Sequence, residues 1–294
     1  MGKYKQHDVA IKMFVNPEKI DDKEFRKEIS IMSLVREPNL ILTCYGGSTK
    51  KGNKFIVTEL MEGSVFEVLH DKGVEIDEHI RLIMAISIAK SVEFLHSCNL
   101  IHRDLKSLNL LVNKHFEIKI CDFGLSRIID KHAPMTGNVG TVCWIAPEIY
   151  NNKKLYSEKA DVYSYGIILW ELLMREMPFG DTETFTIPVL VTKGKRPKIP
   201  KHTAKEWSKL IEKCWHQKPE KRPDFPQILV TLDAMWAAFH HKNPQLSKPV
   251  AFELSKEGQN FKLNTIDEAA ALAKHYPAHA IWGPPSHQEK KKKT

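Results

Sequence analysis

The sequence of 294 residues contains no hydrophobic run long enough to cross a membrane. Its most apolar stretch, residues 165–174, includes Glu171 and is far shorter than the roughly 20 residues that span a bilayer. The N-terminus has no apolar signal-peptide core, and Gln6 stands where a myristoylation signal prefers Ser or Thr. These absences predict a cytoplasmic protein without a transmembrane segment.

Cysteine pairs are also absent from the sequence. The five cysteines are scattered, and no two of them form a C-x-x-C motif, so neither a zinc site nor a disulfide framework is indicated. With only 14 Gly and 16 Pro, and with 42% apolar and 27% charged residues, the chain lies outside the fibrous and disordered ranges. We expect reduced cysteines and either one large domain or two lobes of ordinary size.

The net charge of +8 does not form a basic segment interleaved with aromatic residues, which nucleic-acid binding would favour. The block of like charge is residues 290–293, and residues 241–294 hold nine Lys against five acidic residues. We therefore expect no nucleic-acid partner. The basic end of the chain is interpreted as a solvated tail, with a targeting or polyanion-binding signal as the alternative.

Apolar periodicity divides the chain into a strand-rich part and a helical part. In the first part, β-branched runs predict three strands, over residues 9–12, 40–44 and 54–59. A helical spacing of apolar residues predicts one helix, over residues 21–35. A turn-rich stretch, residues 46–53, separates the last two strands. The second part begins after a hinge near residues 59–63.

The helical part opens with a long helix over residues 80–95, for which Asp77 stands as the N-cap. Two strand pieces follow it, over residues 110–112 and 117–121, and then an irregular stretch that runs up to Pro147. Three more helices are predicted over residues 162–174, 204–215 and 225–239. The predicted fold class is α+β. A small antiparallel-sheet lobe occupies about residues 1–60, and a larger, mainly helical lobe occupies about residues 63–240.

Acidic, basic and amide side chains gather between the long helix and the two strand pieces, and again directly after these strand pieces. Residues 102–109 have the sequence HRDLKSLN, and a DFG motif begins at Asp122, thirteen residues after Asn109. Phosphoryl transfer needs a divalent metal held by oxygen ligands, a carboxylate that orients a hydroxyl nucleophile, and cations that spread the charge of the transferred group. Asp104 would accept the proton of the attacking hydroxyl, and Lys106 would contact the γ-phosphate. Asn109 and Asp122 would hold Mg²⁺.

These motifs resemble those of eukaryotic protein kinases, and the match runs over about residues 2–239. Lys12, at the end of VAIK, resembles the strand lysine that steadies the α- and β-phosphates of ATP. Glu28, sixteen residues later, stands where a helix glutamate pairs with that lysine. Further matches are the APE motif that ends at Glu148, Asp161 in DVYSYG, which braces the catalytic loop, and Arg222, which pairs with Glu148. The resemblance implies a bilobal kinase fold, ATP and Mg²⁺ as cofactors, and proteins as substrates.

Two positions resemble serine/threonine kinases in particular: Lys106, two residues after the catalytic aspartate, and Thr141 after a glycine. By resemblance, the Thr141 hydroxyl hydrogen-bonds Asp104 and Lys106 and shapes the pocket for the substrate residue. The segments DVYSYGIILWE, CW and KRPDF resemble the tyrosine-kinase-like group. We interpret the chain as a tyrosine-kinase-like Ser/Thr protein kinase, and dual specificity stays open.

The resemblance also assigns positions around the nucleotide. Thr58, just before the hinge, stands as the gatekeeper, a small side chain that leaves a back pocket open. Adenine is expected to hydrogen-bond the backbone around Glu59 and Met61. His102 is expected to pack against Phe123 in a hydrophobic spine and is given no chemical role.

A regulatory position is implied as well. In kinases of this kind, an arginine such as Arg103, directly before the catalytic aspartate, binds a phosphate on the activation segment and orders it. That segment corresponds to residues 122–148. Thr136 is the preferred phosphosite, with Ser126 second, and either an upstream activating kinase or autophosphorylation would supply the phosphate.

One family feature is missing upstream of Lys12. Protein kinases place a strand and a G-x-G-x-x-G loop there, whereas Lys12 lies eleven residues from the start of this sequence. Residues 2–5 resemble the strand that leaves the loop. Two hypotheses follow. The chain is a fragment or short form of a longer catalytic kinase, in which case we expect this form to be weak or inactive because the loop is missing, or it is a kinase-like scaffold with weak or no catalysis.

Residues 241–294 do not follow the kinase pattern. Two short strands and a capped helix are predicted there, over residues 249–254, 260–263 and from Thr265 to about 277. That order faintly resembles the second half of a phosphotyrosine-binding Src-homology module, which some amoebal kinases carry after the catalytic domain. The phosphate-binding first half is absent, so a disordered or domain-packing tail is favoured over a working binding module.

Overall fold

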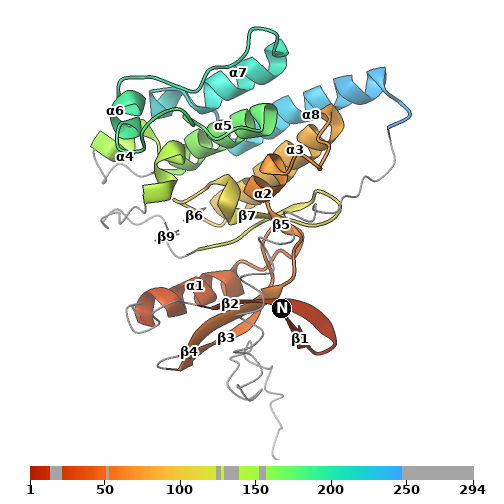
Figure 1. Ribbon diagram of the computed structural model, residues 1–294, viewed down its shortest axis with the longest axis vertical. Coiled ribbons are helices and arrows are strands. Elements are labelled where there is room, and N and C mark those ends of the chain that lie inside the picture. Colours follow the sequence, from red (N-terminus) through yellow and green to blue (C-terminus); the bar gives the residue numbers. More distant parts are fainter. Residues whose placement is uncertain (14–21, 51–52, 124–126, 129–138, 152–156, 247–294) are drawn as a thin grey trace, which may run out of the picture.

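The computed structural model describes residues 1–13, 22–50, 53–123, 127–128, 139–151 and 157–246. The chain folds into two lobes that differ in kind (Figure 1). A β-sheet with one helix forms the small N-terminal lobe, and helices form most of the larger lobe. This is the bilobal α+β architecture that the sequence predicts. No helix within these ranges is long and apolar enough to cross a membrane.

The small lobe is built on a four-stranded antiparallel sheet in the order β1-β2-β4-β3. Its strands are β1 (Gly2–Tyr4), β2 (His7–Met13), β3 (Cys44–Lys50) and β4 (Asn53–Glu59). Helix α1 (Asp22–Leu34) covers one face, where Phe25 and Ile29 pack against Ile56. Since successive side chains of a strand point to opposite faces, the neighbours of Ile56 form a second cluster on the other face, of Val9, Phe55 and Val57.

The large lobe holds helices α2 to α8 in chain order. Their bounds are Val65–His70, Glu78–Ser97, Pro147–Asn151, Glu158–Met174, Ile187–Thr192, Lys205–Cys214 and Phe225–Lys242. Two small sheets, β5-β7-β8 and β6-β9, lie near the lobe junction and comprise Gly63–Ser64 (β5), Leu100–Ile101 (β6), Leu110–Val112 (β7), Ile118–Ile120 (β8) and Arg127–Ile128 (β9). The described 3₁₀ turns are η2 (Ser107–Asn109), η3 (Val139–Trp144) and η4 (Pro219–Lys221).

Side-chain caps fix where several helices begin. The first N–H groups of a helix have no partner within it, so a side-chain oxygen must accept them. Asp77 Oδ1 accepts the N–H of Ile80 at 2.8 Å, which confirms the predicted N-cap of α3. A capping box at the start of α2 joins Ser64 and Glu67 in both directions.

The long predicted helices are confirmed, and the short ones are missed. The helices expected at residues 21–35, 80–95, 162–174, 204–215 and 225–239 correspond to α1, α3, α5, α7 and α8. Helices α2, α4 and α6 have six residues or fewer, and so short a segment carries too little periodicity to be recognised. The strands and helix expected after residue 249 lie outside the described residues.

The strand expected at residues 40–44 is wrong, because the strand in this region is Cys44–Lys50. The apolar residues before it pack at the lobe junction instead. There the Leu42 N–H donates to the carbonyl of Ile120 at 3.0 Å, and the Ile120 N–H donates to the carbonyl of Leu40 at 3.0 Å. The apolar run at residues 40–42 correctly indicated a buried segment. The large lobe covers this segment, and not a neighbouring strand of the small-lobe sheet.

Gly46 and Gly47, which begin the stretch predicted as a turn, lie inside strand β3, whereas Gly52 lies outside the described residues. Gly46 has φ of 148° and follows a β-bulge at Cys44. A Cβ on Gly47 would lie 2.5 Å from the carbonyl oxygen of Phe55 on the paired strand. Glycine is therefore required here for a bulge and for close strand approach, and not for chain reversal.

Helix α5 is the centre of the large lobe (Figure 1). Every residue from Ala160 to Leu172 is buried. Helix α7 packs against α5 so closely that a Cβ on Gly166 would lie 2.9 Å from the Cβ of Cys214 and 2.9 Å from the backbone N of Trp215. Glycine at this position sets the distance between the two helices.

Gly166→Ala is expected to lower the free energy of unfolding by about 1–3 kcal/mol, because the added methyl group overpacks the contact between α5 and α7. Alanine has the higher helix propensity, so a net loss can come only from that contact. Urea denaturation measures it, with Ser208→Ala on the outer part of α7 as the control. A Gly166→Ala protein as stable as the wild type would contradict the close packing.

Candidate active site

Residues 102–109, here called the HRD loop, lie between β6 and β7 and are held by α5. The backbone N–H groups of His102 and Arg103 donate to the two carboxylate oxygens of Asp161 at 2.9 and 3.0 Å. Arg103 has φ of 70°, a left-handed conformation that a non-glycine residue keeps only when its surroundings impose it. Asp161 therefore fixes the path of the HRD loop, as the kinase resemblance implies.

The carboxylate of Asp161 is buried, and its hydrogen-bond partners offset the cost of that burial. Burial by itself would raise its pKa, but several partners outweigh burial and hold the pKa below its ordinary value. They are the hydrogen bond with His96 at 2.9 Å, the charges of His96 and His102, and the backbone N–H of His102. Asp161 thus stays ionised, and an ionised carboxylate can accept all these bonds at once.

Asp104 lies in the HRD loop with one carboxylate oxygen engaged. Its Oδ2 accepts from Nζ of Lys106 at 2.7 Å and from Nδ2 of Asn109 at 3.0 Å. The same Asn109 amide group also donates to the backbone carbonyl of Asp104 at 2.8 Å. Oδ1 of Asp104 is buried and has no hydrogen-bond partner among the described residues. The loop therefore holds the carboxylate in place through Oδ2 and leaves the hydrogen-bonding capacity of Oδ1 unused.

Asp122 meets the small lobe at the junction of the lobes. It follows β8 with φ of 64°, and the preceding N–H, of Cys121, donates to the carbonyl of Asn109 at 3.0 Å. Nζ of Lys12, on β2, lies 3.6 Å from Oδ2 of Asp122, and the two side chains are 44% and 40% exposed. A lysine of the small lobe and an aspartate of the large lobe thus face each other with solvent access.

The predicted hinge connects both lobes through the side chain of Glu59. Its carboxylate accepts from the N–H of Thr43 at 2.7 Å and from Nζ of Lys119, on β8, at 2.6 Å. Thr58 is buried, and its hydroxyl donates to the carbonyl of Glu59 at 3.1 Å. Met61 is buried at the end of the hinge. The predicted nucleotide residues of the hinge therefore lie between the two lobes.

Several expected positions fall partly or wholly outside the described part of the structure. Glu28 lies in α1 and Thr141 in η3, but their side chains are not among those described. Thr136 and Ser126 lie outside the described residues. By contrast, His102 has the packing role expected for it, because its ring meets that of Phe123 edge to face at a centroid distance of 5.6 Å.

Glu148 and Arg222 form the buried ion pair that the resemblance implies. Two guanidinium nitrogens of Arg222 donate to the two carboxylate oxygens of Glu148, each at 2.7 Å. Arg222 also donates to the backbone carbonyls of Lys159 and His216 at 2.8 Å each, and its side chain is fully buried. The pair fastens the start of α4 to the turn before α8.

Sequence reasoning gave no role to three residues that the structure brings together. Glu171 on α5 is fully buried. Its Oε1 accepts from the hydroxyl of Ser107 at 2.8 Å, and its Oε2 accepts from Nε1 of Trp144 at 2.7 Å. Burial raises the pKa of Glu171 to about 8, although both hydrogen bonds act in the opposite direction. The available signal was an acidic residue inside the most apolar stretch of the chain.

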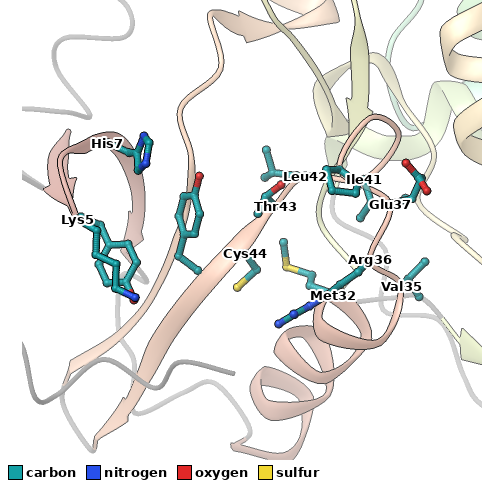
Figure 2. A pocket seen from close by; sticks show the side chains of 13 residues that line it. Lys5, His7, Met32, Val35, Arg36, Glu37, Ile41, Leu42, Thr43 and Cys44 are labelled. Atoms are coloured by element: carbon teal, nitrogen blue, oxygen red, sulfur yellow. The ribbon is translucent and has the colours of Figure 1, made fainter. Parts of the chain in front are cut away.

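A separate cavity of about 670 Å³ lies in the small lobe. Figure 2 shows Lys5 and His7 on one side of it and, on the other, Met32 of α1 with Val35 and Arg36 just after this helix. None of the residues expected to bind nucleotide or metal lines this cavity. It is therefore distinct from the place where Lys12 meets Asp122.

The residues present fit a magnesium ion better than a metal that prefers nitrogen or sulfur. Mg²⁺ takes oxygen ligands, and protein sites usually supply only one or two of them, with water and phosphate oxygens as the rest. Asp122 offers a carboxylate, and Asn109 offers its amide oxygen because its NH₂ group is engaged with Asp104. Within the described ranges no cluster of three His, Cys, Asp or Glu residues could hold a metal by itself.

The comparisons with known proteins agree with this geometry. A family model described as protein tyrosine and serine/threonine kinase matches residues 1–232. The chain belongs to this protein kinase family. Its fold and motif order are therefore those of a kinase catalytic domain.

Similar proteins from several organisms are named serine/threonine-protein kinases. The RGS domain-containing serine/threonine-protein kinase A of Dictyostelium discoideum is 42% identical over 238 residues, which cover 80% of this chain and 21% of that protein. The serine/threonine-protein kinase STY17 of Arabidopsis thaliana is 41% identical over 240 residues, or 80% of this chain and 41% of that protein. A Dictyostelium discoideum protein named "Probable LIM domain-containing serine/threonine-protein kinase" is 42% identical, and the match covers 79% of this chain and 36% of its length. The matched region thus spans less than half of each relative.

Glu171→Gln is expected to change how stability depends on pH. The folded protein keeps the Glu171 proton up to about pH 8, whereas the unfolded chain releases it near the ordinary value of 4.5. Between these values the folded state binds more protons, so the free energy of unfolding of the wild type falls as pH rises. Glutamine does not titrate. Relative to the wild type, the free energy of unfolding of the variant should therefore rise by at least about 1 kcal/mol from pH 5 to pH 8.

Urea denaturation of both proteins across this range measures the shift, and the other titrating groups cancel in the difference. A difference that does not vary with pH would show that Glu171 ionises in the folded protein as it does in water.

Proposed function

We propose that this chain is an ATP-dependent Ser/Thr protein kinase that transfers the γ-phosphate of ATP to Ser and Thr hydroxyls of proteins. The observation that carries the proposal is the state of Asp104. Its carboxylate is fixed by Lys106 and Asn109 through Oδ2, while the buried Oδ1 has no partner among the described residues. A general base needs this arrangement, because it must be held in place and still have an oxygen for the proton it accepts.

In this mechanism Asp104 Oδ1 accepts the hydrogen bond of the substrate hydroxyl, orients its oxygen and takes its proton during attack. Nζ of Lys106, held 2.7 Å from the same carboxylate, places a positive charge beside the transferred phosphoryl group. When bound, Mg-ATP supplies the phosphoryl group and further neutralises its charge. The Thr141 hydroxyl is proposed to contact Asp104 and Lys106 and to complete the pocket for the substrate residue.

The nucleotide is proposed to lie between the lobes. Lys12 would contact its α- and β-phosphates and Glu28 would orient that lysine. Asn109 and Asp122 would hold Mg²⁺, and the backbone of Glu59 and Met61 would bind adenine beside Thr58. A cytoplasmic location is proposed as well, supported by the free thiol state of all five cysteines.

Asp104→Asn is expected to lower phosphate incorporation into a generic basic protein by about a hundredfold or more, because the amide keeps the shape but cannot take the proton. Magnesium-dependent ATP binding, measured by calorimetry, should change less than about threefold. Asp233→Asn, an exposed substitution of the same kind on α8, is the matched control.

Three outcomes separate the hypotheses. Transfer by the wild type that the Asp104 substitution abolishes supports the kinase. Equal transfer by both proteins contradicts the role of Asp104. Nucleotide binding by the wild type without any transfer favours the kinase-like scaffold.

The activation segment, residues 122–148, is proposed to be a phosphorylation switch. Arg103 lies directly before Asp104, and its backbone is fixed by Asp161. A phosphate on Thr136 that paired with the Arg103 guanidinium would order the segment and couple it to the HRD loop.

Thr136→Ala is expected to lower transfer by about tenfold, as a phosphate-ordered loop implies. When Thr136→Ala is added to Arg103→Ala, transfer should fall no further, because each substitution breaks the same interaction. Ser126→Ala tests the second candidate site and is expected to leave transfer unchanged if Thr136 carries the phosphate. Fully active protein in which mass spectrometry finds no phosphate between residues 122 and 148 would contradict the switch.

A further inference from the structure

The carboxyl group of Glu171 bridges three elements inside the large lobe. Glu171 lies on α5 and is fully buried. It binds Ser107 of the HRD loop through Oε1 at 2.8 Å and Trp144 at the end of η3 through Oε2 at 2.7 Å. One side chain therefore connects the loop that carries Asp104 with the segment that carries Thr141.

Ser107 is well placed to control the geometry of the HRD loop. It directly follows Lys106 and begins η2, which ends at Asn109. The N–H of Asn109 donates to the carbonyl of Lys106 at 2.9 Å and closes this turn. Because Ser107 is fully buried, water does not compete for its hydroxyl. Anchoring Ser107 thus fixes the turn that joins Lys106 to Asn109, and these are two of the residues proposed for chemistry.

Trp144 is held by α5 in two places. Its indole N–H donates to Glu171, and its backbone carbonyl accepts from the hydroxyl of Ser164 at 2.7 Å. Its side chain is almost completely buried. The end of η3 therefore has one position relative to α5, and Glu171 gives the HRD loop a fixed position relative to the same helix.

Packing alone does not account for an acid at this position. Leu169 and Leu172 on the same helix are fully buried apolar residues. A buried ionisable group carries a desolvation cost that an apolar side chain of similar size avoids. The two hydrogen bonds are what an apolar residue could not supply, and both lead to the proposed site.

We propose that Glu171 is a positioning residue for phosphoryl transfer, which holds the HRD loop and the end of the activation segment at one fixed separation. This inference rests on the proposed kinase function. Glu171 acts through Ser107 on Lys106 and Asn109, and through Trp144 on the segment expected to contact the substrate. Misplacement of reacting groups by about 1 Å can lower a rate on the order of a hundredfold, so a loose connection here would affect catalysis strongly.

Two substitutions at Glu171 test the proposal. Glu171→Leu removes both hydrogen-bond acceptors. We expect its kcat for peptide phosphorylation to fall at least tenfold, when the rate is divided by the number of ATP-binding sites counted by calorimetry. The KM for ATP should stay within twofold of the wild-type value. Glu171→Gln can accept from Trp144 through its amide oxygen and donate to Ser107 through its amide nitrogen. It is therefore expected to restore at least a third of the wild-type kcat at pH 7.

Ser107→Ala breaks only the arm to the HRD loop and remains informative if Glu171→Leu does not fold. It is expected to lower kcat about fivefold or more with the KM for ATP unchanged. Ser91→Ala is its matched control, since Ser91 is an equally buried serine whose hydroxyl donates to backbone carbonyls of Ser87 and Ile118, away from the HRD loop.

A readout independent of activity separates this inference from the kinase proposal. Hydrogen exchange of the Trp144 indole N–H, assigned by NMR with Trp144→Phe, should be at least tenfold faster in Glu171→Leu than in the wild type or Glu171→Gln. Slow exchange in all three proteins would overturn the bridge. Unchanged kcat per binding site in both Glu171→Leu and Ser107→Ala would overturn the positioning role. A wild type with no transfer but with the expected exchange pattern would contradict the kinase proposal alone.

Discussion

The polar row of helix α5 is the constraint on which the site depends. A helix buried on every side must satisfy its polar side chains internally, since water cannot reach them. Asp161, Ser164 and Glu171 are spaced by three and seven residues, so they lie on one face of the helix. Most of their partners are groups of the HRD loop and of Trp144 at the end of η3, and His96 on α3 is a further partner. The helix and the loops thus satisfy each other.

This arrangement explains how irregular chain can be rigid at the chemistry. Arg103 and Asp122 both have left-handed backbones, and such conformations in non-glycine residues cost on the order of 1–3 kcal/mol each. The compensation at Arg103 is visible: its N–H and that of His102 bind one buried carboxylate. Burial of the helix, ionisation of Asp161 and the shape of the HRD loop are therefore parts of one interaction.

The junction between the two lobes has fewer buried apolar contacts than the interior of the large lobe. The small-lobe sheet has its own apolar clusters, whereas Met32 near the C-terminal end of α1 and Val35 just after it belong to the main core. Glu59 links the lobes through Thr43 and Lys119. The end of α1 is thus anchored to the large lobe, and the half-exposed Lys12 and Asp122 meet where the sheet and the large lobe face each other. A site at such a junction can admit a nucleotide without disturbing the main core.

Much of this protein was determined by the sequence alone. The long amphipathic or apolar helices, the Asp77 cap and the order of the motifs are local patterns, so they predicted the lobes, the hinge and the residues gathered around Asp104. Where the sequence misled, the deciding contact was distant: residues 40–42 are buried by β8, and Gly46 and Gly47 serve a bulge and a close strand contact. The bridge from Glu171 to Ser107 and Trp144 spans 64 and 27 residues of sequence. Only the tertiary structure could decide these features, because a hydrogen bond between distant residues depends on how the helices pack and leaves no periodic signal in the chain.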